Sequence, residues 1–350
     1  MSNQSGCPPV GVQLEAQILP PVLGLDVILG LIGNSVALWI FCCKLKTWNP
    51  NNIFLFNLLI ADFMALVSLP LRIDALVRSF WVFGDGLCRI NLFLMFSNRS
   101  ASIAMMTVVA TYRYLKVVHP LSSLSRLSRL HAVIISAVVW TLVAAPRVPM
   151  LSLSHIKVLQ NQTQCFFFTS YGETSALRLG LVSSHRIITV LEFVFPFSIL
   201  VFCSIRISRF LKARGTVGDQ KKVKRAMRVC VVIVGVFVLC FMPTSVTTAG
   251  IWIVQSQRPW NCTAFYTLTQ LTIVSLGLNF LNSALDPLLY VFSSSNFRKA
   301  LVQSLPQCLQ RRTKPKPGPG PGPGPNQSQS ETGSTAATQS TSQHELMSIN

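Results

Sequence analysis

Apolar residues gather in seven long runs along the chain, separated by shorter polar segments. The runs cover roughly residues 19–43, 52–73, 89–111, 132–154, 187–205, 229–254 and 266–293. Each run is long enough to cross a hydrocarbon core of about 30 Å as a helix. The pattern therefore predicts an all-α membrane protein with a bundle of seven transmembrane helices over residues 19–300. An odd number of crossings places the two ends of the chain on opposite sides of the membrane.

Composition excludes a soluble protein with a single core. Half of the residues are hydrophobic, only 12% are charged, and the mean hydropathy is +0.49. Of the 30 Lys and Arg residues, 21 lie in the segments that follow the first, third, fifth and seventh runs. By the positive-inside rule these segments are cytoplasmic, so residues 1–18 form an extracellular N-terminus. This distribution accounts for the net charge of +19 without a nucleic-acid partner.

The two ends of the chain differ in character. The first twenty residues lack the basic and short apolar regions of a signal peptide, so we expect the first run to direct insertion. Sequons at Asn3 and Asn161 lie on the predicted outer side and predict N-glycosylation. Residues 301–350 are rich in Pro and Gly and then in Ser, Thr and Gln. Such a segment cannot bury a core, so we expect a disordered cytoplasmic tail open to phosphorylation.

The third run carries the most informative spacing. Cys88 and Arg113 are 25 residues apart, about 37 Å in a helix, and Arg99 is the only formal charge between Arg89 and Arg113. The cysteine, the Arg113-Tyr114 pair and the following VVHP resemble the third span of rhodopsin-like G-protein-coupled receptors. The resemblance extends over residues 20–300 through GN at 33–34, LxxxD ending at Asp62, WVFG at 81–84, CFMP at 240–243 and DPLLY at 286–290.

Membership of that family implies a plasma-membrane receptor with a heterotrimeric G protein, of the Gi class, as its partner. It also implies arrestin, receptor kinases and membrane lipids as further partners, and Phe297-Arg298-Lys299 fits an amphipathic eighth helix on the inner leaflet. Pro243 removes one hydrogen bond from the sixth helix and predicts a pivot. The implied coupling and switch residues are Tyr112, Arg113, Tyr114, Phe237, Phe241, Pro243, Asp286, Pro287 and Tyr290.

One departure from the family concerns basal activity. The family usually has Asp before the arginine at the inner end of the third helix, and this chain has Tyr112 before Arg113. The carboxylate that would hold the arginine in the resting state is missing. We therefore expect elevated signalling without ligand.

Four cysteines, at positions 7, 88, 165 and 262, face the predicted oxidising side, and their positions alone allow three pairings. The family resemblance favours a disulfide between Cys88 and Cys165. That choice leaves Cys7 to pair with Cys262.

A buried arginine narrows the ligand. Arg99 lies eleven residues after Cys88, about 16 Å inward, where an isolated charge is costly and a carboxylate is a suitable bidentate partner. Asn98-Arg99, LPLR at 69–72 and YLKVVHP at 114–120 resemble the cluster of hydroxycarboxylic acid and oxoeicosanoid receptors. The resemblance implies that Arg99 anchors a ligand carboxylate; the alternative is a salt bridge with Glu192 or Asp74. Arg72 is either a second cation at the mouth of the site, or an arginine that snorkels or pairs with Asp74.

Aromatic residues suggest which carboxylate binds. Phe166 and Phe167 follow Cys165 and form either a lid over an apolar ligand or a loop packed on the helix ends. Phe280 stands where hydroxycarboxylic acid receptors have a tyrosine. We therefore favour an oxidised long-chain fatty acid of the 5-oxo-eicosanoid type, closest to the oxoeicosanoid receptor; the alternative is a short hydroxycarboxylic acid such as lactate, 3-hydroxybutyrate or a nicotinate-like acid.

Other classes receive less support. The sequence shows no internal repeat, which disfavours an organic-anion transporter. The five histidines are scattered and form no HExxH motif, so we do not expect an enzyme or a catalytic residue.

The resemblance implies no cofactor other than an allosteric sodium ion; the alternative is a water-filled network. The oxygen donors of that site would be Asp62, Asn98, Ser102, Asn282 and Ser283.

Overall fold

The computed structural model describes residues 13–159, 162–165, 176–213, 217–257 and 261–304 of the 350-residue chain. Within these ranges, seven helices are long and apolar enough to span a membrane, which confirms the predicted fold class. The long helices are α1 (Gln13–Trp39), α2 (Pro50–Arg78), α3 (Gly84–Val118), α4 (Arg129–Ala144), α6 (Ala176–Ala213), α7 (Val217–Gln257) and α8 (Cys262–Ser293). Shorter elements are the π turn η1 (Ile40–Lys44), the 3-10 turns η2 (Ser123–Ser125) and η3 (Ala145–Arg147), α5 (Pro149–Ser152), β1 (Ile156–Leu159), β2 (Gln162–Cys165) and α9 (Ser295–Ser304).

The element bounds refine the predicted domains at both ends. Helix α1 starts at Gln13, before the expected boundary at residue 19, because the polar first turns continue the helix beyond its apolar part. Helix α9 continues to Ser304 and so extends past the expected boundary at residue 300. Phe297 and Ala300 of α9 are buried while Arg298 and Lys299 are exposed, as an amphipathic helix requires. The expected disordered tail otherwise lies outside the described residues.

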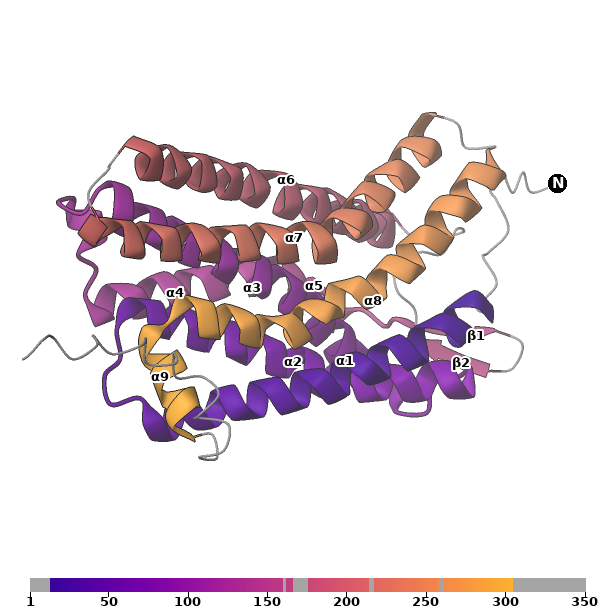
Figure 1. Cartoon of the computed structure of the whole chain (residues 1–350). Coiled ribbons are helices and arrows are strands. Elements are labelled where there is room, and N and C mark those ends of the chain that lie inside the picture. The colour runs from indigo at the N-terminus through magenta and orange to yellow at the C-terminus, as the bar shows by residue number, and fades with distance from the viewer. Residues whose placement is uncertain (1–12, 160–161, 166–175, 214–216, 258–260, 305–350) are drawn as a thin grey trace, which may run out of the picture. The chain divides into compact units, whose positions relative to one another are not determined.

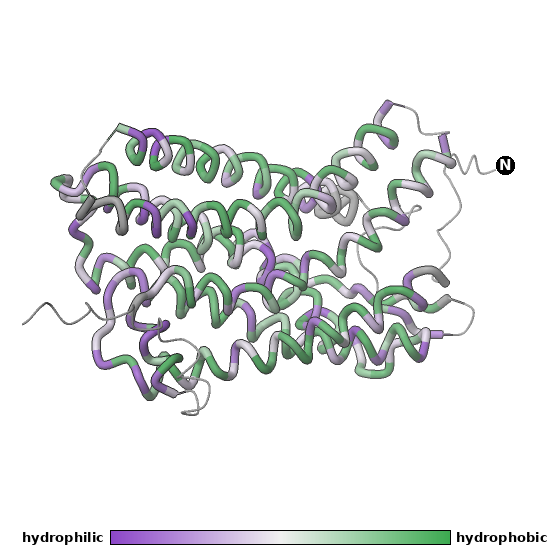
Figure 2. Tube along the Cα trace, in the orientation of Figure 1, coloured by the Kyte–Doolittle hydropathy of each residue, from purple (hydrophilic) through white to green (hydrophobic). Residues whose placement is uncertain are grey.

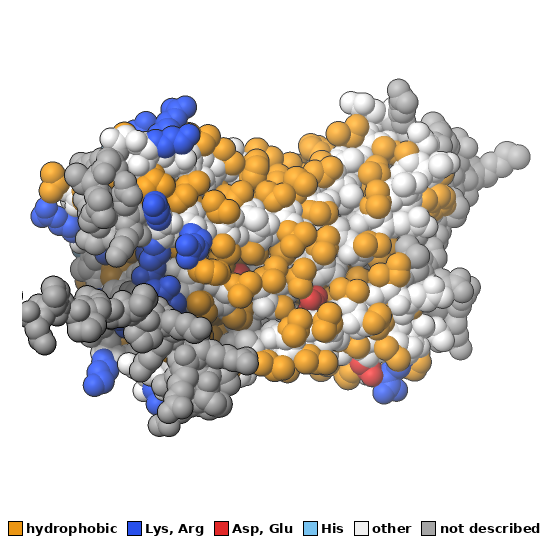
Figure 3. All heavy atoms as spheres, in the orientation of Figure 1, with side chains coloured by type: hydrophobic (Ala, Val, Ile, Leu, Met, Phe, Trp, Pro, Cys, Tyr) orange, Lys and Arg blue, Asp and Glu red, His pale blue; other side chains and the backbone are white. Residues whose placement is uncertain are grey.

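The long helices run side by side, with α7 packed between α6 and α8, and α1 against α2 and α8 (Figure 1). Hydrophobic residues occupy the middle of the bundle and hydrophilic ones become frequent near its ends (Figure 2). Large apolar side chains such as Ile32, Val67 and Leu142 are exposed on the outside. An apolar belt of this size suits a lipid environment rather than water (Figure 3).

The two ends of the bundle differ. At one end, here called the disulfide end, Cys88 of α3 is bonded to Cys165 of β2, and β1 pairs with β2 antiparallel from Ile156↔Cys165 to Leu159↔Gln162. At the opposite end, the α9 end, blue Lys and Arg side chains gather (Figure 3). The described part of the chain thus separates the Cys88–Cys165 disulfide from its largest group of cations along the bundle axis.

Prolines and glycines shape the packing of α7 and α8. Both helices bend as they approach the disulfide end (Figure 1), and each contains an internal proline, Pro243 and Pro287. Beside Pro287, α1 carries Gly33, at which an added Cβ would lie 2.6 Å from the proline Cγ. The next residue, Asn34, donates a 2.8 Å hydrogen bond to the carbonyl of Ser283. The glycine therefore allows α1 to approach α8 closely at the DPLLY segment.

Candidate functional site

Arg99 lies inside the bundle on α3, and its side chain is only 8% exposed. One terminal nitrogen, Nη1, donates to Glu192 Oε2 of α6 at 3.2 Å, and the other, Nη2, donates to Ser245 Oγ of α7 at 2.9 Å. The guanidinium carbon also lies 5.8 Å from the ring centroid of Phe241. The third nitrogen, Nε, is buried and has no hydrogen-bond partner among the described residues. Arg99 therefore keeps donor capacity after its contacts within the protein.

Glu192 has more partners than Arg99 alone. Its Oε1 accepts from Ser100 Oγ at 2.6 Å, and Nη2 of Arg147 lies 3.0 and 3.1 Å from Oε1 and Oε2. The salt bridge between Arg99 and Glu192, one of the two alternatives for Arg99, is present in the structure. Asp74, the other proposed partner, pairs with Arg78 of its own helix instead.

Arg147 is the second guanidinium of this site, and sequence reasoning missed it. It lies in η3 directly after α4, its side chain is 2% exposed, and Nη1 donates to Nδ1 of His185 on α6 at 2.7 Å. Its guanidinium carbon lies 5.8 Å from the ring centroid of Phe96. A signal was available, because Arg147 is the only formal charge in the apolar run 132–154.

We call these residues the arginine cluster: Arg99, Ser100, Arg147, His185, Glu192 and Ser245. The cluster joins α3, η3, α6 and α7, and contains two guanidinium groups for one carboxylate. Unpaired charge in a membrane interior is costly. The excess of positive charge makes the cluster a candidate binding site for one anion.

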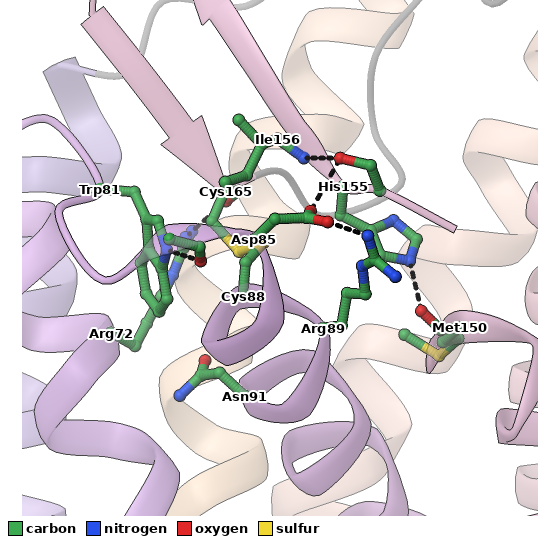
Figure 4. Close-up of a disulfide and its surroundings, with 12 residues drawn as sticks. Arg72, Trp81, Asp85, Cys88, Arg89, Asn91, Met150, His155, Ile156 and Cys165 are labelled. Atoms are coloured by element: carbon green, nitrogen blue, oxygen red, sulfur yellow. Dashed lines mark hydrogen bonds and ion pairs between the residues drawn. A yellow bond between two sulfur atoms is a disulfide. The ribbon is translucent and has the colours of Figure 1, made fainter. Parts of the chain in front are cut away.

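Arg72 of α2 lies near the Cys88–Cys165 disulfide and contacts α1 and β2. It donates to Glu15 of α1 and, at 3.2 Å, to the carbonyl of Cys165, and it lies beside the disulfide with Trp81 (Figure 4). Its ion-pair partner is thus Glu15, and Asp74, named in one of the alternatives for Arg72, pairs with Arg78 instead. The pair joins α1 to α2 and holds the end of β2 against them.

The aromatic residues of the expected ligand site fall into two groups. Phe280 of α8 is 5% exposed and packs in an apolar cluster with Leu19, Leu69 and Met95 of α1, α2 and α3. This cluster is distinct from the arginine cluster, which instead borders the rings of Phe241 and Phe96. Phe166, Phe167, Asn3 and Asn161 lie outside the described residues.

The residues of the expected cation site are buried together in the middle of the bundle. Asp62, Asn98, Ser102, Asn282 and Ser283 are all at most 1% exposed. Tyr290 donates to Asp62 Oδ2 at 2.8 Å, and Asn98 Nδ2 donates to the carbonyl of Ala61 at 2.8 Å.

The remaining oxygens of this site are short of partners. No hydrogen bond to another described residue satisfies Asp62 Oδ1, Asn98 Oδ1, Ser102 Oγ, Asn282 Oδ1, Ser283 Oγ or either carboxylate oxygen of Asp286. Carboxylate, amide and hydroxyl oxygens are the donors that hard cations prefer. The donor set therefore fits a sodium ion, and Asp286 adds a second carboxylate that the expected set lacked. Among the described residues no cluster of three His, Cys, Asp or Glu suits a metal ion.

Arg113 and Arg225 meet the last turn of α8 at the α9 end. Arg113 of α3 donates to the carbonyl of Ser293, and Arg225 Nε of α7 donates to the carbonyl of Phe292 at 3.2 Å. We call these two contacts the α8 cap. Carbonyls in the last turn of a helix have no acceptor role within it and carry partial negative charge. Arg113 forms no salt bridge with a described residue, so backbone carbonyl contact takes the place of the usual carboxylate.

The tyrosines on either side of Arg113 make contacts with other residues rather than an ion pair with Arg113. Tyr112 is buried edge-on against Phe54, with ring centroids 5.8 Å apart, and Lys116 lies over its ring. Tyr114 shares a 2.9 Å hydrogen bond with His119 and contacts Phe202. Neither tyrosine supplies the anionic partner that the family usually places before the arginine.

An aromatic stack extends from the arginine cluster toward the centre of the bundle. Phe241, whose ring borders the guanidinium of Arg99, contacts Phe237 edge-on with ring centroids 5.5 Å apart. Phe237 in turn stacks on Phe193 of α6, with centroids 5.4 Å apart. Phe237, Phe241 and Pro243 all lie on α7. The stack therefore connects the arginine cluster to the part of α7 that contains the predicted pivot.

The cysteine expectations agree with the structure where it can be described. Cys88 is bonded to Cys165, as the family resemblance implied. Cys262 is also disulfide-bonded. Its expected partner, Cys7, lies outside the described residues.

Sequence comparison places these features in a known group. Residues 33–290 match the 7 transmembrane receptor (rhodopsin family) profile. Human hydroxycarboxylic acid receptor 3 is 39% identical over 299 residues, which cover 85% of this chain and 75% of that receptor. Human oxoeicosanoid receptor 1 is 35% identical over 308 residues, covering 85% and 74%. The mouse 12-(S)-hydroxy-5,8,10,14-eicosatetraenoic acid receptor is 32% identical over 295 residues, covering 83% and 89%.

These relatives are receptors rather than enzymes, and the expected cluster of hydroxycarboxylic acid and oxoeicosanoid receptors is confirmed. Human hydroxycarboxylic acid receptor 3 is more similar to this chain than human oxoeicosanoid receptor 1 is, so the comparisons do not confirm the predicted closer resemblance to the oxoeicosanoid receptor. The family profile covers most of the membrane-spanning part of the chain. The chain belongs to the rhodopsin family of seven-transmembrane receptors, in the cluster of hydroxycarboxylic acid and oxoeicosanoid receptors.

Proposed function

We propose that the protein is a plasma-membrane receptor that binds an extracellular carboxylate at Arg99 and signals through a G protein of the Gi class. The disulfide end is extracellular and the α9 end is cytoplasmic, because the latter carries most of the Lys and Arg residues. The observation that carries the proposal is the charge of the arginine cluster. A structural ion pair needs one guanidinium for Glu192, and this site has two.

The agonist class that we favour is an oxidised long-chain fatty acid of the 5-oxo-eicosanoid type. Rings of Phe241 and Phe96 flank the two guanidinium groups, which suits a carboxylate attached to an apolar chain. Two of the relatives are named for eicosanoids. An eicosanoid acid combines a carboxylate with a long apolar chain. Short hydroxycarboxylic acids are the second candidate, supported by the 39% identity to hydroxycarboxylic acid receptor 3.

Signalling follows from a shift between two states of the bundle. A carboxylate on Arg99 changes the contacts of Ser245 and Phe241, both on α7. Phe241 passes the change to Phe237, and α7 pivots at Pro243 so that its cytoplasmic end moves away from α8. That movement breaks the contact of Arg225 with Phe292 and frees Arg113 for the G protein. Ligand thus favours the state in which the α8 cap is open.

A sodium ion would be held by Asp62, Asn98, Ser102, Asn282 and Ser283, together with Asp286. When bound, the ion would supply positive charge next to two carboxylates that are otherwise buried in the membrane interior. The unpartnered oxygens of this site support the proposal. Helix α9 rests on membrane lipid, and the Ser- and Thr-rich tail serves receptor kinases and arrestin.

The test is Gi activation in transfected cells by a 5-oxo polyunsaturated fatty acid, lactate and 3-hydroxybutyrate. The variants are wild type, Arg99→Ala and Arg78→Ala; Arg78 is an exposed arginine that serves as a matched control. We expect the long-chain acid to activate wild type and Arg78→Ala but not Arg99→Ala at equal surface expression. Activation by the short acids alone would select the second candidate. Equal activation of Arg99→Ala would remove Arg99 as the anchor.

A further inference from the structure

The contacts of Glu192 with its two arginines are unequal. Arg147 Nη2 contacts both carboxylate oxygens at 3.0 and 3.1 Å, and Ser100 donates to one of them at 2.6 Å. Arg99 contributes a single hydrogen bond at 3.2 Å. Because Arg147 and Ser100 already engage both oxygens, Glu192 stays paired and hydrogen-bonded when Arg99 turns to another anion.

Arg147 is held in place independently of Glu192. Its Nη1 donates to His185 at 2.7 Å, its Nη2 also lies 3.0 Å from Ser100 Oγ, and its guanidinium lies over Phe96. The side chain is 2% exposed. These contacts fix the guanidinium at the end of η3, so it meets Glu192 without a change in rotamer.

The charges of the cluster make this arrangement matter for ligand binding. If Glu192 had Arg99 as its only cation, an incoming carboxylate would have to displace it and would leave a charged side chain unpaired in the membrane. The two carboxylates would also repel each other across one guanidinium. With Arg147 present, a bound carboxylate brings the cluster to two positive and two negative charges.

We infer that Arg147 is a positioning residue that neutralises Glu192 and so keeps Arg99 available for the carboxylate of the ligand. The inference rests on the proposed function of Arg99. It assigns ligand affinity to a side chain that contacts Glu192 through both carboxylate oxygens rather than the ligand itself. It also implies that Glu192 competes with the ligand carboxylate for Arg99, and that Arg147 weakens this competition.

The test is a double-mutant cycle with Arg147→Met, Glu192→Gln and the double variant, measured as agonist potency in the Gi assay. We expect Arg147→Met to weaken the potency about tenfold or more, because Glu192 then occupies Arg99. We expect the double variant to return to within about threefold of Glu192→Gln alone, since a neutral amide does not compete for a guanidinium. Arg78→Met is the matched control, and potency is compared at equal surface expression.

A purely structural role for Arg147 predicts a different pattern. The single and the double variants would then lose potency equally, because the contacts of Arg147 with His185 and Phe96 are absent in both. Equal losses, or an unchanged potency in Arg147→Met, would overturn the inference. Rescue by Glu192→Gln is the result that supports it.

A second arm needs no agonist and measures thermal unfolding of the purified receptor. We expect Glu192→Gln to raise the Tm of Arg147→Met more than it raises the Tm of Arg99→Met, since Arg147 is the stronger partner. Equal rescue of the two would overturn the unequal sharing of Glu192. If no carboxylate activates the wild type, the proposed function fails and the role in ligand binding fails with it, while this arm still decides which arginine holds Glu192.

Discussion

The α8 cap offers a quantitative test of the resting state. Arg225 on α7 donates to the carbonyl of Phe292 on α8, so the contact joins the two helices that separate in the proposed active state. We consider the substitution Arg225→Met, which keeps most of the aliphatic stem and removes the guanidinium. Because the proposed movement breaks this hydrogen bond, its loss should favour the active state.

The size of the effect follows from the contact. A hydrogen bond from a charged donor contributes about 1.5–3 kcal/mol, and the half-buried position of Arg225 favours the lower end of this range. A loss of about 1.4 kcal/mol changes an equilibrium constant about tenfold. We therefore expect the ratio of active to resting receptor to rise up to about tenfold without ligand.

The assay is ligand-free Gi signalling at matched surface expression. Arg228→Met is the control, because Arg228 is an exposed arginine one turn further along α7. We expect raised basal signalling in Arg225→Met and wild-type signalling in Arg228→Met. Equal basal signalling in wild type and both variants would refute a role for the α8 cap in the resting state.

Three further predictions concern other parts of the bundle. Tyr112→Asp supplies the carboxylate that the family usually has, so we expect lower ligand-free signalling; an unchanged level contradicts the expectation of elevated basal activity. If sodium binds at Asp62, replacing sodium by a large organic cation should change agonist affinity in wild type but not in Asp62→Asn, and equal responses would count against the site. Gly33→Ala should lower the free energy of unfolding by about 1–3 kcal/mol, because its Cβ would lie 2.6 Å from Pro287 Cγ. Gly24→Ala is the control in a thermal unfolding assay, since nothing lies within 4 Å of its added Cβ, and a Tm as low in the control would show that helix packing is not the cause.

Hydropathy predicted the seven helices because lipid contact requires long apolar segments, which leave a direct record in the sequence. It did not predict where α1 begins, because Gln13 and Glu15 extend the helix beyond its apolar part. This matters for Arg72, because its partner Glu15 lies in this polar extension of α1, ahead of the apolar run.

The sequence predicts part of the arginine cluster, because a charge within an apolar run can be recognised but its partners on other helices cannot be singled out. Arg99 was visible as a single charge in an apolar run, and Glu192 was among its expected partners. Arg147 was equally visible, but its pairing with Glu192 joins residues 45 positions apart and has no periodic signal. The α8 cap could not be predicted at all, since its acceptors are backbone carbonyls, which every residue has.

The attachment of the β1–β2 hairpin has a consequence for the route of the ligand. Three separate contacts hold β2: the disulfide to Cys88, the hydrogen bond from Arg72 to the carbonyl of Cys165, and the backbone hydrogen bond from Trp81 to Thr163 (Figure 4). These contacts come from α2, α3 and the turn between them, so the hairpin moves only if that part of the bundle moves with it. Under the proposed function, an agonist that binds Arg99 would pass a rigid rim, and differences in access rate between related receptors should arise from segments other than this hairpin.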